Sequence, residues 1–173
     1  MSENPSRRER YHHGDLARAT AEAAFAMVEI GGLASLSMRQ IASSLGVTHK
    51  ALSRHYDNGH ALQAAVAEIA FERLADAVKS VPCRHEFCRA YIRFALHQPN
   101  IYALMMSGFD PAPPALRAAM LRLVSEAQRT FESDDAAKRA WLVLHGGLAL
   151  HTNRILEPRD AAELESFLVA LAV

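Results

Sequence analysis

The sequence has little of what cross-links a fold or carries it across a membrane. Of its 173 residues only two are cysteine and one is tryptophan, which excludes a disulfide-rich scaffold. The charge-free run around the most apolar region, Ala140 to Asn153, has 14 residues, fewer than the ~20 that a membrane-spanning helix needs. The first thirteen residues carry three arginines, and no apolar block of the signal-peptide kind follows them. We therefore expect a cytoplasmic protein that does not contact a membrane.

Apolar residues make up 50% of the chain, which is enough for a folded protein with a real core. The charges balance, with 19 lysines and arginines against 19 acids, but they are unevenly placed. Residues 33–60 hold Arg39, Lys50 and Arg54 against a single acid, Asp57, whereas residues 61–173 are close to neutral. Such a basic patch attracts a phosphate backbone, although many basic patches are ordinary solvated faces.

Apolar residues recur at helical spacing along the chain, and no alternating strand pattern of useful length interrupts them. All seven prolines lie between these segments or at their starts, where a missing N–H does no harm. The pattern predicts an all-α protein with about nine helices. We expect them near residues 16–30, 37–45, 48–56, 60–79, 83–98, 100–106, 116–131, 134–156 and 160–171.

The segment from Ser37 to Tyr56, SMRQIASSLGVTHKALSRHY, carries the clearest functional pattern. Two short helices meet at a tight turn in which Gly46 occupies the position that needs a positive φ, as in a helix-turn-helix. The segment contains no acid. The second helix displays short or basic side chains that fit a major groove about 12 Å wide. An ordinary helical hairpin has the same pattern, so both interpretations remain open at this point.

From Tyr11 to Val66 the chain resembles the N-terminal DNA-binding domain of TetR/AcrR-type transcriptional regulators. Residues 98–106 (QPNIYALMM) and 140–147 (AWLVLHGG) are similar to the C-terminal domain named for its Trp-His-Gly signature. The resemblance implies a flexible basic arm at 1–13, a helix-turn-helix domain at 14–58 and a helical effector-binding and dimerisation domain at 59–173. It also implies a ligand-responsive regulator, most simply a repressor, that binds palindromic double-stranded DNA as a homodimer.

The resemblance assigns roles to individual positions of the helix-turn-helix. Thr48 matches the residue that caps the recognition helix and meets a phosphate, and Tyr56 matches an aromatic at its end. The arm arginines Arg7, Arg8 and Arg10 match contacts to the DNA backbone or minor groove. The full expected DNA-binding set is Arg39, Thr48, His49, Lys50, Ala51, Ser53, Arg54, His55 and Tyr56.

Two positions depart from the family pattern. Ser53 stands where the family usually has tyrosine, and Gly59 stands where it usually has lysine, and both family residues bind phosphate. We therefore expect weaker anchoring on the DNA backbone, with His55, His60 or the arm compensating. The alternative function is a helical interaction module or small-ligand sensor whose DNA binding is weak or lost.

The helix predicted after Asp134 contains Gly146 and Gly147, which each cost about 1 kcal/mol of helix stability relative to alanine. Close approach of another helix explains two such glycines, and we predict a two-fold dimer packed as a four-helix bundle. The expected interface residues are Trp141, Leu144, Gly146, Gly147, Leu148, Phe167, Leu168 and Leu171.

An effector pocket for a largely apolar small molecule is expected in the same half of the chain. Its candidate residues are Phe94, His97, Tyr102, Met105, Met106, Phe109, Met120, Trp141 and His145. Methionines and aromatics at this spacing also fit an ordinary core.

No enzyme motif is found: the sequence has no G-x-S-x-G, no H-E-x-x-H and no P-loop. Cys83, His85 and Cys88 do not complete a tetrahedral zinc site. Within a helix the two cysteines lie too far apart and point too differently to form a disulfide. We expect no metal, no cofactor and no catalytic activity.

Overall fold

The computed structural model describes residues 13–173, and it describes side chains from Leu16 onward. The predicted arm residues Arg7, Arg8 and Arg10 lie outside the described part. Between residues 13 and 173 the chain forms nine α-helices and one short 3₁₀ turn and contains no strand, which confirms the all-α prediction. The elements are α1 (His13–Gly31), η1 (Leu33–Ser35), α2 (Met38–Ser44), α3 (His49–Leu52), α4 (Gly59–Val78), α5 (Arg84–His97), α6 (Pro99–Met105), α7 (Pro114–Thr130), α8 (Asp134–Thr152) and α9 (Ala161–Ala172).

Short polar side chains begin several of these helices, as the sequence predicts. The Ser37 hydroxyl accepts a hydrogen bond from the Gln40 backbone N–H at 3.4 Å at the start of α2. The Asp160 carboxylate accepts one from the Glu163 N–H at 2.8 Å at the start of α9. Such bonds satisfy donors that the first helical turn leaves without partners.

Two helices are shorter than predicted. Helix α3 ends at Leu52, and the predicted end near Tyr56 is wrong because the chain continues in turns. Helix α8 ends at Thr152 and not near Leu156, because the N–H groups of Ile155 and Leu156 both donate to the Leu150 carbonyl and close a turn there. Ile155, which follows the last turn of α8, is 72% exposed.

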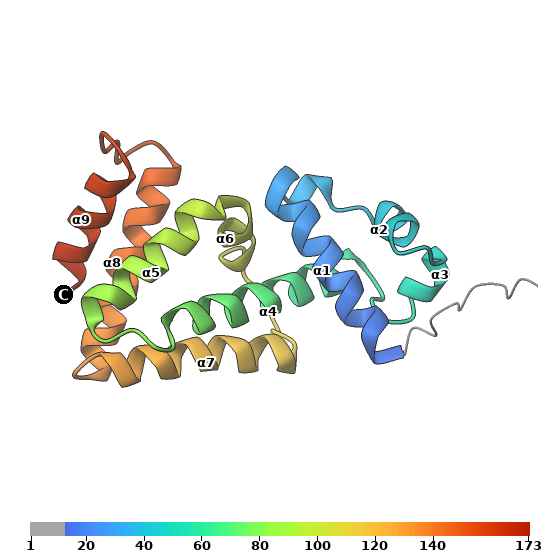
Figure 1. The fold of residues 1–173 in the computed structure, drawn as a ribbon, viewed down its shortest axis with the longest axis horizontal. Coiled ribbons are helices and arrows are strands. Elements are labelled where there is room, and N and C mark those ends of the chain that lie inside the picture. The colour runs from blue at the N-terminus through green and yellow to red at the C-terminus, as the bar shows by residue number, and fades with distance from the viewer. Residues whose placement is uncertain (1–12) are drawn as a thin grey trace, which may run out of the picture.

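Helix α4 connects the two ends of the molecule (Figure 1). One end carries α1, α2 and α3, which we call the head, and α7 packs along the length of α4. Helices α5 and α6 also contact α4, and α8 and α9 pack together at the far end from the head. One contiguous cluster of buried apolar side chains runs from α1 to α9, so the two ends share a core.

Charged side chains fasten α1 to α4. Arg18 pairs with Glu72 at 3.1 Å, and Arg73 pairs with Glu22 at 2.6 Å while its guanidinium lies 4.0 Å from the centre of the Phe25 ring. Exposed ion pairs contribute little singly, but these two cross between the same two helices in opposite directions. They hold the head at a fixed orientation on α4.

None of the helices in the described part of the chain is long and apolar enough to cross a bilayer.

Candidate nucleic-acid interface

Helices α2 and α3 are joined by a tight turn that its sequence dictates. Gly46 has a φ of 65°, in the left-handed region that glycine occupies without steric cost. The Thr48 hydroxyl accepts a hydrogen bond from the Ala51 N–H at 3.2 Å and caps α3. The predicted glycine turn and threonine cap are thus both present. Together they fix the direction in which α3 leaves α2.

The inner face of the head is apolar. Ile41 and Leu52 are fully buried, Ala42 nearly so, and Leu45 and Val47 are half-buried. These side chains pack α2 and α3 against α1. The buried face therefore sets which side chains of α3 are left on the outside.

Tyr56 has a different position from the other predicted DNA-binding residues. Its side chain is half-buried, and its hydroxyl donates a hydrogen bond to the Ala17 carbonyl of α1 at 2.8 Å. Burial raises the pKa of the phenol, as does the negative charge of Glu68, against the opposing charge of Arg18. The Tyr56 hydroxyl thus links the end of the helix-turn-helix to α1.

The other eight predicted residues lie together on α2, α3 and the turns beside them. Arg39, Thr48, His49, Lys50 and Arg54 are exposed, and Ala51, Ser53 and His55 are half-exposed. Within the described part of the chain, Arg39, Lys50 and Arg54 make no ion pair with an acid, whereas most arginines elsewhere do. The head therefore presents cations whose charge the protein itself does not neutralise.

The two positions that depart from the family pattern, Ser53 and Gly59, have different surroundings in the structure. The Ser53 hydroxyl donates to the His49 carbonyl at 3.1 Å and lies 3.3 Å from Nδ1 of His49, so it is engaged inside α3. Gly59 is the first residue of α4, and a Cβ built on it would meet no atom within 4 Å. Gly59 therefore faces open space, where a longer side chain would fit.

Only half of the predicted dimer interface lies on the surface. Trp141, Gly146, Phe167 and Leu171 are exposed on the outer faces of α8 and α9. The other four residues are buried within the chain itself, contrary to the expectation that they face a second copy. They are Leu144, Gly147, Leu148 and Leu168.

Gly147 shows the reason for this error. A Cβ at Gly147 would collide with Cδ2 of Leu168 and lie 3.1 Å from its Cδ1, so α9 of the same chain requires the small residue. A Cβ at Gly146 would meet nothing within 4 Å. Leu142 and Leu150, which are not among the predicted interface residues, are 70% and 45% exposed on α8. The adjacent apolar pair at 141 and 142 was the available signal, because two neighbouring residues of a helix face different directions.

The nine predicted effector-pocket residues lie outside two cavities found within residues 13–173. One cavity lies between α1, η1 and α2, and the other lies between α5, the α7–α8 turn, α8 and α9, and neither is lined by any of the nine. His97, Met120 and Trp141 are exposed, Phe94, Met106, Phe109 and His145 are half-buried, and Tyr102 and Met105 belong to the core. The helical spacing indicated which residues lie on the same face of each helix, but it did not indicate which neighbouring helix covers that face.

Three of the polar side chains in this half hydrogen-bond to one another. The Tyr102 hydroxyl lies 3.3 Å from the Tyr91 hydroxyl and 3.2 Å from Nδ1 of His145. Burial is the main cause that raises the pKa of both phenols. This series of hydrogen bonds provides partners for polar side chains of α5, α6 and α8 in and beside the core.

The two cysteines lie in different environments. Cys83 is exposed at the start of α5, and Cys88 is buried, which raises the pKa of its thiol to about 11. From residue 13 to residue 173 no three histidine, cysteine or acidic side chains are grouped as a metal site would require.

Comparison with known proteins identifies the fold. The family model described as "Tetracyclin repressor-like, C-terminal domain" matches residues 85–172, half of the chain. A protein of unknown function from Rhodococcus sp. RHA1 is 27% identical, with a TM-score of 0.70 over 95% of this chain and 96% of that one. No curated relative matches the chain.

Two further solved structures share the fold at lower identity. A TetR-family transcriptional regulator described as putative, from Mesorhizobium loti, is 17% identical, with a TM-score of 0.66 over 93% of this chain and 95% of that one. The multidrug binding protein EbrR, in complex with proflavin, is 20% identical, with a TM-score of 0.62 over 90% and 99%. With its helix-turn-helix, its all-α architecture and this family match, the chain belongs to the tetracyclin repressor-like (TetR) family of transcription regulators, which are not enzymes.

Proposed function

We propose that this protein is a ligand-responsive transcriptional repressor that binds palindromic operator DNA as a homodimer. The observation that carries the proposal is the surface of the head. From Ser37 to Tyr56 the sequence has no acid, and Arg39, Lys50 and Arg54 are exposed without an acidic partner in the described part of the chain. Cations that the protein leaves uncompensated favour binding to a polyanion.

The residues of this surface divide into two roles by position. Thr48 and Arg39 bind phosphates, because they lie beside the turn and on α2. His49 and Lys50 form the first turn of α3 and read base edges, because the first turn of a recognition helix enters the major groove. Lysine contacts to guanine O6 and N7 are among the common specific contacts.

The outer faces of α8 and α9 support a dimer. Trp141, Leu142 and Leu150 on α8 and Phe167 and Leu171 on α9 are large apolar side chains that are between 45% and 70% exposed. Large contiguous patches of exposed apolar side chains mark interaction sites in soluble proteins. Pairing α8 and α9 with the same helices of a second copy gives a four-helix bundle. The two heads then bind half-sites about 34–36 Å apart.

The contacts between the head and the rest of the chain support a conformational switch. The Asn100 side chain on α6 donates to the Glu29 carbonyl of α1 at 3.0 Å, and α4 contacts both α1 and α7. An effector that binds among the C-terminal helices and favours a displaced α4 changes the spacing of the two heads and lowers the affinity for DNA. EbrR, which shares the fold, is a multidrug binding protein complexed with proflavin.

One specific observation favours the second candidate, a helical interaction module with weak or lost DNA binding. The Ser53 hydroxyl is engaged with His49, and Gly59 offers no side chain, so two phosphate contacts of the family pattern are missing. Fluorescence anisotropy with mixed-sequence DNA at about 50 mM salt separates the two candidates, because nonspecific DNA binding is strong at low salt. Lack of binding there supports the module.

Selection of binding sites from random DNA tests the repressor directly. We expect a palindrome whose half-sites are one helical turn apart, or a multiple of this distance. Sedimentation of the purified protein with and without the selected DNA gives the number of subunits bound. An unsymmetrical site bound by a single subunit contradicts the proposal.

A further inference from the structure

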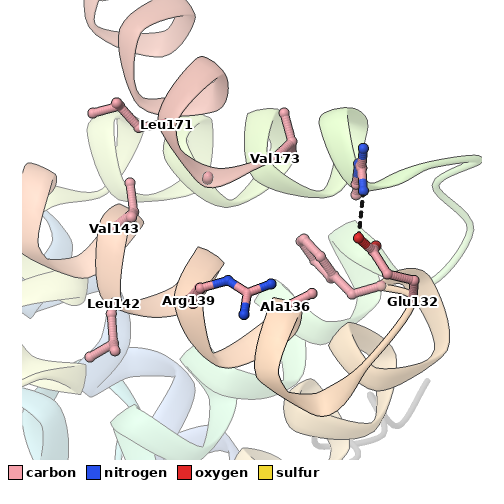
Figure 2. Close-up of a pocket in the computed structure, with 10 residues that line it drawn as sticks. Glu132, Ala136, Arg139, Leu142, Val143, Leu171 and Val173 are labelled. Atoms are coloured by element: carbon pink, nitrogen blue, oxygen red, sulfur yellow. Dashed lines mark hydrogen bonds and ion pairs between the residues drawn. The ribbon is translucent and has the colours of Figure 1, made fainter.

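A cavity of about 320 Å³ lies where the start of α5, the α7–α8 turn, the middle of α8 and the end of α9 meet (Figure 2). None of the predicted DNA-binding or effector residues lines it, and its only member among the predicted interface residues is Leu171. The cavity is lined by Arg84, Phe131, Glu132, Ala136, Arg139, Leu142, Val143, Leu171, Ala172 and Val173.

The charged residues of this cavity are unequally paired. Arg84 and Glu132 form an ion pair at 2.8 Å, drawn as the dashed line in Figure 2. A hydrogen bond from the backbone and one from Arg84 lower the pKa of Glu132, and the positive charges of Arg84 and Arg139 lower it further, against the effect of burial. Arg84 is in direct contact with this acid, whereas Arg139 acts on it through its charge and makes no ion pair or hydrogen bond within residues 13–173. The guanidinium of Arg139 is therefore the one in this cavity whose N–H groups have no acceptor in the described chain.

The rest of the lining is apolar. Phe131, Ala136 and Ala172 are buried and form the inner wall, and Val143 is half-buried. Leu142 and Leu171 are 70% and 58% exposed, and Figure 2 shows them at the end of the cavity opposite Glu132. An apolar wall with one available guanidinium suits a molecule that is apolar over most of its length and negatively charged at one end.

We propose that this cavity binds a small amphipathic carboxylate, whose carboxylate pairs with Arg139 and whose apolar body packs against Val143, Leu142 and Leu171. A guanidinium pairs with a carboxylate through two parallel hydrogen bonds, which a hydroxyl or an amide cannot reproduce. The volume lies at the small end of the ~300–1,000 Å³ range of small-molecule sites, which restricts the ligand to short acyl chains or a single ring system.

The position of the cavity links its occupancy to dimerisation. Leu142 and Leu171 belong both to the cavity and to the outer faces of α8 and α9 that we propose as the dimer interface. A ligand that packs on Leu171 changes the surface offered to the second copy, and by linkage the second copy changes the affinity for the ligand. The binding step itself involves no DNA contact, so it is tested separately from the proposed repressor function.

Isothermal titration of the full chain with octanoate and with octanol tests the proposal, because the two probes differ at the polar end alone. We expect saturable binding of octanoate, at least about tenfold tighter than that of octanol, since a hydrogen bond to a charged group contributes about 1.5–3 kcal/mol. Arg139→Gln removes this preference, and Val143→Phe, which fills the cavity, abolishes binding of both probes.

Matched variants keep the test specific. Lys138→Gln removes one positive charge from the neighbouring position on α8, and Leu121→Ser removes an exposed apolar side chain from α7, outside the cavity. Both are expected to bind octanoate as the unmodified chain does. Circular dichroism verifies that all variants fold, and Arg139 has no partner whose loss would unfold the protein. Equal binding of the two probes, no saturable binding, or equal effects of Arg139→Gln and Lys138→Gln overturns the proposal.

Discussion

The head and the α8–α9 end both expose side chains that have few contacts within the chain, but those of the head are cationic and those of the α8–α9 end are mainly apolar. On the head the exposed side chains Arg39, Lys50 and Arg54 lack acidic partners in the described chain, whereas on α5 and α9 Arg93 is paired with Glu165 at 2.9 Å. At the α8–α9 end large apolar side chains such as Trp141 and Phe167 are exposed, beside Arg139. The difference indicates a polyanionic partner for the head and an apolar partner for α8 and α9. Added salt should weaken the first contact and leave the second largely intact.

Placing a charge in the apolar face should have the largest effect. Phe167→Glu is expected to convert the dimer into a monomer, because a carboxylate would be buried without a partner. The affinity for a palindromic operator should fall about 100-fold or more, since the two heads no longer bind together. Sedimentation and anisotropy measure the two effects. Leu121→Glu, on the exposed face of α7, is the control, and a dimer that tolerates Phe167→Glu at the same concentration would rule out this interface.

The two neighbouring glycines of α8 should respond to alanine with opposite signs. Gly147→Ala places a Cβ against the buried Leu168 and should destabilise the fold by about 1–3 kcal/mol. Gly146→Ala meets no atom of its own chain and should stabilise α8 by about 1 kcal/mol in the monomer. Thermal unfolding gives both values. If Gly146→Ala weakens the dimer, then Gly146 lies where the second helix approaches.

On the head, the loss of one base contact should be selective. Lys50→Ala is expected to cost about 1–3 kcal/mol on the preferred operator and to relax the preference at one base pair. Lys79→Ala, at the far end of α4, carries the same change of charge and should have little effect. A loss from Lys50→Ala that is equal on all DNA sequences would show that Lys50 contacts phosphate.

The missing phosphate contact should be restorable. Gly59→Lys adds a cation where no atom lies within 4 Å, so we expect tighter binding to all DNA sequences without loss of stability. The slope of log affinity against log salt should steepen by about one unit. Anisotropy titrations at several salt concentrations measure the slope, with Ala77→Lys on the exposed side of α4 as the control. An unchanged slope would mean that the start of α4 lies away from the DNA.

The smallest effect is expected at the joint between the two regions. Burial raises the pKa of Glu68, and the charge of Glu72 adds to this against Arg18. Ionised Glu68 is therefore less favourable in the folded than in the unfolded chain. Glu68→Gln should slightly stabilise the protein at pH 7, and the gain should disappear as the pH falls through the raised pKa toward ~4.3, the usual value of glutamate. Unfolding from pH 4 to pH 8 measures it, and a gain that is independent of pH would exclude this cause.

Local signals predicted the head well. A helix cap or a glycine turn is set by a few neighbouring residues, so the local sequence is enough to predict it. Ser37 and Thr48 cap α2 and α3, and Gly46 has a positive φ in the turn between them. The outward residues followed from the helical period, because the inner face of so small a unit is buried on one side alone. Tyr56 is different, because its partner Ala17 is 39 residues away in sequence.

The C-terminal half could not be predicted to the same depth. Each helix there contacts several others, and the period of a helix does not specify which neighbour covers which face. Gly147 and Leu168 illustrate this, because the intramolecular contact of α8 with α9 produces the same pattern as a contact between two chains. The cavity at Arg139 combines residues from three helices, a turn and the last residue of the chain, so no local pattern indicated it.

Because α4 is long, a small tilt of this helix moves its end by a large distance. With 20 residues it is about 30 Å long, and α7 packs along it while its Gly59 end adjoins the head. A tilt of about 5° pivoting at the Val78 end carries the Gly59 end through roughly 2.6 Å. That travel approaches the ~3.4 Å rise between successive bases of a strand. A slight repacking of α4 on α7 would thus shift the head by most of the distance between two successive bases.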